Sequence, residues 1–223
     1  MKEYDIERII ASLSLRKPVF HSEDDLQSAF ADEVKNIYPQ AKVKREIPYN
    51  SVSGYSEDEE TPIYSKGSTR IDVQVSLENN VFLIELKYKT KFLSVEVDNE
   101  KYTLKEHGAH NDNRVLFVRD VSRLEDYMIN EYNQTKITEA YAIFITNDPE
   151  YQRVKKDSSV IKDYDISIGE MKTGVLRNRN KPEQTVFLAG EYVSNWSEYS
   201  RVSAERNGVF WINIYRVYRE NLK

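Results

Sequence analysis

Apolar residues recur at helical spacing in two stretches near the start of the chain. The first stripe consists of Ile6, Ile9, Ile10 and Leu13, and the second of Leu26, Phe30, Val34 and Ile37. Each stripe predicts an amphipathic helix with one buried face. Ser22 is a favoured N-cap residue before the second stripe, and Pro39 ends it. A third helix is predicted over residues 115–132, where Val118, Val121, Leu124, Tyr127 and Met128 recur.

Alternating or continuous apolar residues predict strands in the rest of the chain. These strands lie at residues 42–49, 69–77, 81–88, 139–146, 185–193 and 209–218. The segment 139–146, EAYAIFIT, is nearly all apolar, so we expect a strand inside the sheet with both faces covered. Residues 51–67 are rich in Ser, Gly and acidic side chains and predict a loop, and residues 89–113 are polar and irregular.

The order of these elements favours an α/β or α+β fold in which helices flank a mixed sheet. We expect a single domain over residues 1–223, because neither a linker nor an internal repeat divides the chain. Residues 1–20 then form an N-terminal helical segment, and residues 156–223 form a strand-rich C-terminal extension.

The composition excludes several kinds of site. The 223 residues include no cysteine, which rules out disulfides, thiolate zinc sites and a cysteine nucleophile. The net charge of −5 argues against a uniformly basic nucleic-acid-coating protein, although 32 Lys and Arg residues leave room for a local basic groove. No apolar run approaches the roughly 18 residues that a membrane span needs, so we expect a cytoplasmic protein without membrane contact.

One carboxylate interrupts the most apolar of the paired strands. The run from Val81 to Leu86 would be entirely apolar without Glu85. Burying an unpaired charge is costly, so Glu85 must be paired, exposed or bound to a cation. A residue that breaks the local pattern in this way is a candidate functional residue.

A tight turn centred on Asn79-Asn80 sets the expected register of the two strands. It pairs Gln74 with Glu85 and Asp72 with Lys87. Because side chains alternate along a strand, these four residues are expected on one face, with Asp72 and Glu85 as diagonal neighbours. Two carboxylates, a main-chain carbonyl such as that of Leu86, and waters form the oxygen-rich ligand set that Mg²⁺ or Mn²⁺ prefers. A metal so held polarises a phosphate and activates water, while a nearby Lys stabilises negative charge.

The segments Arg70-Ile71-Asp72 and Ile84-Glu85-Leu86-Lys87 resemble the motif of the PD-(D/E)XK nuclease superfamily. The resemblance implies a restriction-endonuclease-like fold, in which Asp72 and Glu85 bind the metal and Lys87 serves catalysis. Many members also use an acidic residue or Gln on the preceding helix. Here Glu23 is the candidate, with Gln27 one turn later, and Asp24 is the alternative.

The resemblance extends more loosely to uncharacterised restriction-endonuclease-like proteins. A helix resembling RDVSRLEDYM and a strand resembling YAIFITNDPEYQ follow the site in those proteins, so the resemblance covers most of residues 20–155. This chain departs from the family pattern at Ile71, where Pro often precedes the Asp. Because the motif is short, its specificity depends on the predicted helix and hairpin around it.

Four residues are expected to contact substrate: Gln27, Gln74, Lys89 and Arg123. Arg123 lies on one side of the third predicted helix with Arg119 and Tyr127, and a solvated face that includes Asp120 and Glu125 is an equally good interpretation. For Asp72, Glu85 and Lys87 the competing interpretation is a charge network across two surface strands. Glu23 in a first helical turn also favours the helix dipole without any catalytic role.

Two histidines, His107 and His110, have the i, i+3 spacing of some metal ligands. Gly108 between them, the polar surroundings and the lack of an evident third ligand favour a solvated loop instead.

These observations predict a Mg²⁺- or Mn²⁺-dependent nuclease that hydrolyses nucleic acid, with DNA as the favoured substrate. Restriction of foreign DNA is the setting that the family resemblance implies, and paired cuts in a duplex often need a homodimer. One alternative is a nuclease fold that no longer cuts and binds nucleic acid or serves a structural role. Another is a small-molecule metal hydrolase, for which we find no further ligands.

Overall fold

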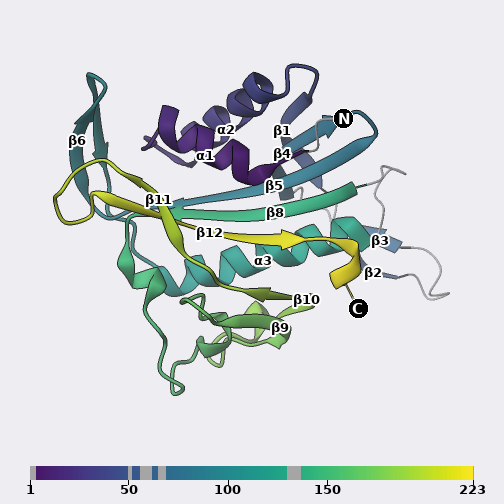
Figure 1. The fold of residues 1–223 in the computed structure, drawn as a ribbon. Coiled ribbons are helices and arrows are strands. Elements are labelled where there is room, and N and C mark those ends of the chain that lie inside the picture. Colours follow the sequence, from purple (N-terminus) through teal and green to yellow (C-terminus); the bar gives the residue numbers. More distant parts are fainter. Residues whose placement is uncertain (1–3, 50–51, 56–61, 65–68, 130–136, 223) are drawn as a thin grey trace.

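A computed structural model of the protein describes residues 4–49, 52–55, 62–64, 69–129 and 137–222. Its α-helices are α1 (Ile6–Arg16), α2 (Glu23–Ile37) and α3 (His110–Ile129). Figure 1 shows four layers: α1 with α2, then the main sheet, then α3, and below α3 a separate pair of strands. The predicted mixed sheet flanked by helices is therefore confirmed as the fold class.

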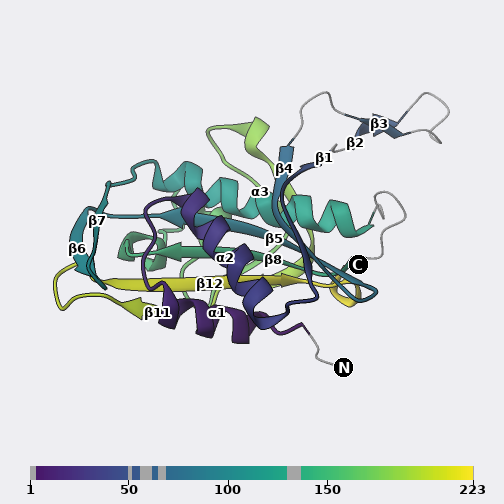
Figure 2. The same cartoon turned by 90° about the horizontal axis from the view of Figure 1, so that it is seen from above.

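The first two helices form where the apolar stripes predict them. All four stripe residues of α1 are buried, and Asp5 caps the helix by accepting a hydrogen bond from the Arg8 N–H. In α2 the Ser22 side chain accepts from the Asp25 N–H, as an N-cap residue should. Both helices pack on the same face of the main sheet (Figure 2).

The main sheet has six strands in the order β1-β4-β5-β8-β12-β11. Their bounds are β1 (Lys42–Tyr49), β4 (Thr69–Leu77), β5 (Asn80–Lys89), β8 (Ile137–Thr146), β11 (Ser197–Arg201) and β12 (Val209–Val217). Neighbouring strands run antiparallel except β5 and β8, which are parallel. The strand expected inside the sheet is β8, and its prediction is confirmed because residues 140–146 are buried.

Three further pairs of strands lie outside the main sheet. They are β2 (Val52–Tyr55) with β3 (Pro62–Tyr64), β6 (Leu93–Val97) with β7 (Glu100–Leu104), and β9 (Met171–Leu176) with β10 (Val186–Val193). The irregular stretch predicted at residues 89–113 is wrong where β6 and β7 form a hairpin and where α3 begins at His110, and it is confirmed for residues 105–109. The loop predicted at 51–67 is also wrong where β2 and β3 pair, and its residues 51, 56–61 and 65–67 lie outside the described ones.

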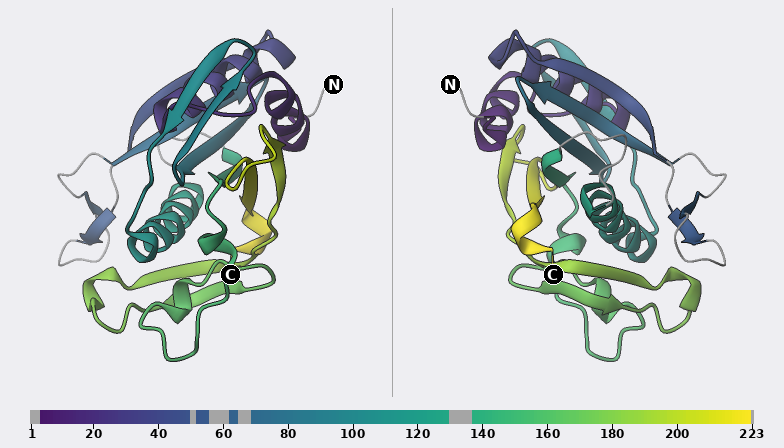
Figure 3. Two further views of the ribbon diagram at one scale, coloured as in Figure 1. Left: turned by 90° about the vertical axis from the view of Figure 1, so that its left-hand side faces the viewer. Right: turned by 90° about the vertical axis from the view of Figure 1, so that its right-hand side faces the viewer.

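Apolar side chains fill both sides of the main sheet. On one side, Val75 and Ile84 of the sheet pack with residues of α1 and α2. On the other side, Leu83 and Ala142 pack with α3, whose far side meets β10. Figure 3 shows α3 enclosed between the main sheet and the β9–β10 pair. None of the helices in the described part of the chain has the length and apolar character needed to cross a membrane.

Candidate active site

The hairpin register differs by two residues from the predicted one. Leu77 pairs with Asn80 and Val73 with Ile84, so the turn is Glu78-Asn79, and Glu78 takes a positive φ of 54°. The predicted pairs Gln74 with Glu85 and Asp72 with Lys87 are therefore wrong. A two-residue shift leaves every side chain on its original face. Continued by one residue, the observed register brings Asp72 level with Glu85 rather than diagonal to it.

Strands β4 and β5 separate where the candidate residues lie. Their pairing stops at Val73 and Ile84, whereas β4 stays paired with β1 as far as Thr69. Beyond that point, two side-chain carboxylates accept the hydrogen bonds that N–H groups of β5 would otherwise donate to β4. Asp72 Oδ2 accepts from the Leu86 N–H at 2.6 Å, and Glu23 Oε2 at the start of α2 accepts from the Tyr88 N–H at 2.9 Å. Because a strand residue's N–H and C=O point to the same edge, the Leu86 carbonyl also faces this gap.

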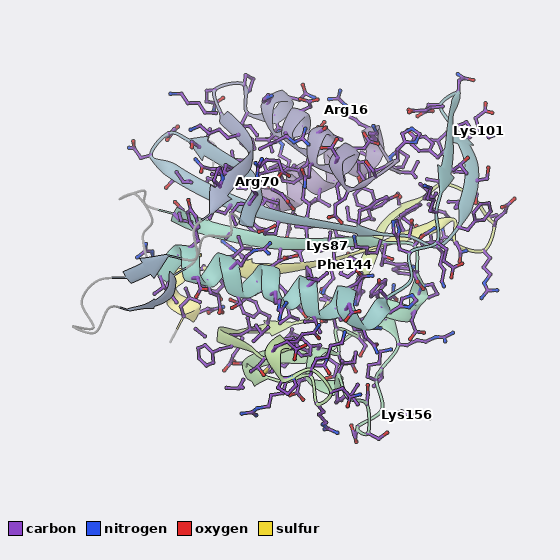
Figure 4. All side chains as sticks on the ribbon, turned by 180° about the vertical axis from the view of Figure 1, so that it is seen from behind. Arg16, Arg70, Lys87, Lys101, Phe144 and Lys156 are labelled. Carbon is purple, nitrogen blue, oxygen red and sulfur yellow. The ribbon has the colours of Figure 1, made fainter. Side chains whose placement is uncertain are left out.

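A chain of ion pairs joins β5 to α3. Glu85 Oε1 lies 2.8 Å from Arg123 Nη2, and the same nitrogen lies 2.7 Å from Asp120 Oδ1. The other Asp120 oxygen, Oδ2, lies 2.9 Å from Lys87 Nζ. Figure 4 shows Lys87 in the space between β5 and α3. Glu85 and Asp120 are only 3% and 4% exposed, so these charges meet largely away from water.

Burial and crowding of negative charge shift the acid–base behaviour of the two carboxylates on the hairpin. Burial, reinforced by the charges of Asp120 and Glu23, raises the pKa of Asp72 from 3.8 to about 6, although the Leu86 N–H lowers it. Burial and the charge of Asp120 also raise the pKa of Glu85 well above its usual value, against the opposing effect of Arg123. Burial alone would lower the pKa of Lys87, but Asp120 and Glu23 outweigh it and the pKa rises.

The structure distinguishes between the two acidic candidates on α2. Glu23 reaches β5, where its Oε2 also lies 3.0 Å from Lys89 Nζ. Asp24 instead forms an ion pair with Arg45 of β1. We name the group Glu23, Asp72, Glu85, Asp120, Lys87, Lys89 and Arg123 the charged cluster.

Of the four residues expected to contact substrate, Lys89 and Arg123 belong to the charged cluster. Gln27 is buried, and its Oε1 accepts from Arg45 Nη2 at 3.3 Å. Gln74 is half-buried, and its Nε2 donates to Ser76 Oγ at 3.4 Å. The hydrogen bonds of these two glutamines therefore run to neighbours outside the cluster. The substrate contacts of all four stay predictions.

Asp120 is the cluster residue that the sequence did not single out. Its place beside Arg119 and Arg123 is typical of a solvated helix face, which was one of the two interpretations considered. The structure shows this interpretation to be wrong for Asp120, because α3 turns the residue toward the sheet. Its i, i+3 spacing to Arg123 was the available signal, but that spacing does not reveal burial.

The two histidines of the predicted solvated loop have defined partners. His107 Nδ1 accepts from the Thr90 N–H at 3.0 Å. His110 begins α3, and its Nε2 lies 2.6 Å from Oδ2 of the buried Asp148. The solvated loop is confirmed for residues 105–109, which are exposed and lie outside any helix or strand, whereas it is wrong for the half-buried His110, which begins α3.

The charged cluster fits a divalent cation in its chemistry and charge. Across the described residues, no three or more His, Asp or Glu side chains are already arranged around a metal position. Nevertheless, Asp72 and Glu85 are two oxygen donors on one sheet face beside the Leu86 carbonyl. The cluster holds four carboxylates and three cationic side chains. Burial, together with the neighbouring negative charges, raises the pKa of Asp72 and of Glu85. A bound cation would offset these negative charges.

Comparisons with known proteins assign no role to the residues of this site. No protein-family model matches the chain, and neither the curated proteins nor the solved structures give a match.

Proposed function

We propose that this protein is a metal-dependent nuclease that hydrolyses phosphodiester bonds of nucleic acid, with DNA as the favoured substrate. The observation that carries the proposal is that half-buried Asp72 and buried Glu85, both with raised pKa values, lie with Lys87 on one face of the sheet. Carboxylates with perturbed pKa values concentrate at functional sites, because burial and neighbouring like charges are arranged there to shift the pKa.

Each cluster residue has a role in this proposal. Asp72, Glu85 and the Leu86 carbonyl would hold Mg²⁺ or Mn²⁺, which supplies Lewis acidity to a phosphate and acidifies a bound water. Lys87 would orient that water and stabilise the negative charge that develops on the phosphate. Asp120 holds the ammonium of Lys87 in place, and Glu23 holds the open edge of β5. The resemblance to PD-(D/E)XK nucleases supports the same assignment of Asp72, Glu85 and Lys87.

A cytoplasmic role in restricting foreign DNA accords with the family resemblance. A homodimer would place two such clusters on opposite strands of a duplex. Both are part of the proposal and rest on the nuclease activity itself.

A second candidate is a nuclease-like module that binds nucleic acid without cutting it. The observation in its favour is that Arg123 already neutralises Glu85 and Asp120 already neutralises Lys87. Such self-contained pairs need no metal to offset the buried charge. Metal binding therefore separates the two candidates before any cleavage is measured.

Cleavage assays test the proposal directly. Plasmid, linear duplex, single-stranded DNA and RNA are incubated with Mg²⁺ or Mn²⁺ and with wild type, Asp72→Ala or Lys87→Ala. We expect cleavage of at least one substrate by wild type and a loss of about 100-fold or more in each variant. Lys101→Ala is the matched control, because Lys101 is exposed on the distant β6–β7 hairpin (Figure 4). Equal cleavage by all four proteins, or none by wild type, would contradict the nuclease proposal.

A further inference from the structure

A groove of about 500 Å³ lies between α3 and the start of β10. Its lining combines two arginines, Arg119 and Arg123, with the hydroxyls of Ser122 and Thr185 and the apolar side chains of Leu116 and Phe187. Among the described residues that line it, none is acidic. A cleft near His110 differs in this respect, because Glu106, Asp148 and Glu150 offset its basic residues.

The apolar part of the groove is presented to solvent rather than packed. Phe187 is 59% exposed and Leu116 is 42% exposed. Ser122 Oγ donates to the Phe187 carbonyl at 3.0 Å, which fixes the backbone that carries the ring. Across the strand pair, Phe187 lies opposite Val175. An exposed aromatic ring on a fixed backbone is suited to stacking against a planar ligand, because little freedom is lost on binding.

The basic part of the groove connects it to the charged cluster. Arg123 lines the groove, and its Nη2 is also the atom that lies 2.8 Å from Glu85. Arg119 lies one turn before it on α3, where its Nη2 donates to the Glu183 carbonyl at 3.0 Å. A guanidinium has five N–H donors, so this bond fixes the position of Arg119 and leaves other N–H groups that can donate to a phosphate.

We propose that this groove binds one unpaired nucleotide of a single-stranded nucleic acid, with its base against Phe187 and Leu116 and its phosphate at Arg119. The chain of the bound strand would then pass Arg123 and reach the charged cluster. Stacking requires an accessible base face, which a continuous duplex does not offer, and phosphate requires the basic lining that the groove has. The use of this groove in cleavage rests on the proposed nuclease function, whereas the binding of a strand in the groove does not.

Fluorescence anisotropy with a labelled single-stranded DNA oligonucleotide, without divalent cations so that no cleavage occurs, tests the proposal. We expect Phe187→Ala to weaken binding about tenfold, which corresponds to the loss of one stacked base. Phe187→Trp should retain or strengthen binding. Phe92→Ala is the matched control, because Phe92 is 58% exposed and lies outside the groove lining. Equal affinities of Phe187→Ala, Phe92→Ala and wild type would overturn the proposal, as would no binding of the strand by wild type.

Salt dependence tests the phosphate contact separately. Arg119→Ala should lower the slope of log affinity against log salt by about 0.7, the value for one phosphate of a single strand. Arg201→Ala, an exposed arginine on β11, should leave the slope unchanged. An unchanged slope in Arg119→Ala would remove Arg119 from the site and contradict the proposed orientation.

Two competitors identify the ligand. A blunt duplex whose binding depends equally on Phe187 would overturn the assignment to an unpaired base. A free nucleoside monophosphate that competes as well as the oligonucleotide would overturn the assignment to a strand. If the strand binds through Phe187 but no cleavage occurs, the binding site stands and the nuclease proposal fails. If cleavage depends on Lys87 but binding does not depend on Phe187, the reverse holds.

Discussion

The ammonium of Lys87 lies 2.9 Å from the carboxylate of Asp120, and the two residues come from different layers of the fold. Lys87 belongs to the sheet, whereas Asp120 belongs to a helix that the β9–β10 pair holds from its other side. The position of the proposed catalytic cation therefore depends on how α3 is docked. A change on α3 can alter the site without touching the motif residues.

Replacement of Asp120 by Asn tests this dependence. The negative charge of Asp120 raises the pKa of both Asp72 and Glu85, so its removal should lower both. The acidic limb of the cleavage-rate profile against pH should then move to lower pH. The maximum rate should fall about 10- to 100-fold, because Lys87 loses the partner that positions it. Asp126→Asn, an exposed carboxylate on the same helix, should leave the profile in place. A full rate with an unmoved profile would rule out a positioning role for Asp120.

Replacement of Asp72 by Asn should change how stability depends on pH in the absence of divalent cations. The pKa of Asp72 is raised in the folded state, so its favourable contribution is present below pH 4 and is lost as pH rises through about 6. Between these limits the variant should gain stability relative to wild type by at most roughly 3 kcal/mol, as the shift from 3.8 to about 6 implies. Urea unfolding across this range measures the difference. For Asp32→Asn, at an exposed position of α2, the difference in unfolding free energy from wild type should not change with pH. A difference that does not change with pH for Asp72→Asn would refute the raised pKa of Asp72.

Divalent cations should stabilise wild type. A free Mg²⁺ concentration of about ten times Kd adds roughly 1.4 kcal/mol, which raises Tm by about 3–5 °C in a domain of this size. Asp72→Asn should lose this increase, because one of the two carboxylate ligands is gone. Lys101→Ala should keep it. An increase of the same size in Asp72→Asn would place the cation elsewhere on the protein.

Gly190 of β10 supports the docking of α3 in a way that substitution can measure. A Cβ at this position would lie 2.6 Å from Tyr192 Oη and 3.1 Å from Glu125 Oε1. Glu125 is buried on α3 and accepts from Tyr192 Oη and from the N–H groups of Ala189 and Gly190. Gly190→Ala should therefore destabilise the fold by about 1–3 kcal/mol in thermal or urea unfolding. Gly108→Ala, where a Cβ meets nothing within 4 Å, should have little effect.

The sequence predicted the elements whose apolar pattern is continuous. The stripe of α1 and the apolar run of β8 are buried as their periodicity predicts, and the stripe of α2 is buried except for the half-buried Ile37. The β6–β7 hairpin was missed because each strand has only five residues, although Leu93, Val95 and Val97 alternate with Ser94 and Glu96 as a half-buried strand should. Its turn did carry a signal, since Asp98 and Asn99 both take positive φ, a conformation that Asp and Asn tolerate.

The sequence predicted which hairpin residues share one face of the sheet, but it did not predict the register in which the two strands pair. Asp72, Glu85 and Lys87 share a face under either register, because a shift of two residues preserves the alternation of side chains. The turn position was misjudged since Asn, rather than Glu78, was expected to take the positive φ. Asp120 and the ion pairs of Arg123 depend on how α3 docks against the sheet, which no local pattern encodes.

The order of strands in the sheet has a consequence for synthesis of the chain on a ribosome. β8 lies between β5 and β12, and β12 is the last strand of the sheet to be translated. At typical translation rates several seconds separate the emergence of β8 from that of its second neighbour. During this time β8, whose residues 140–146 are buried in the folded protein, has one open edge, which is the kind of surface that promotes aggregation. The open edge of β8 is therefore closed only after β9, β10 and β11 have also been translated.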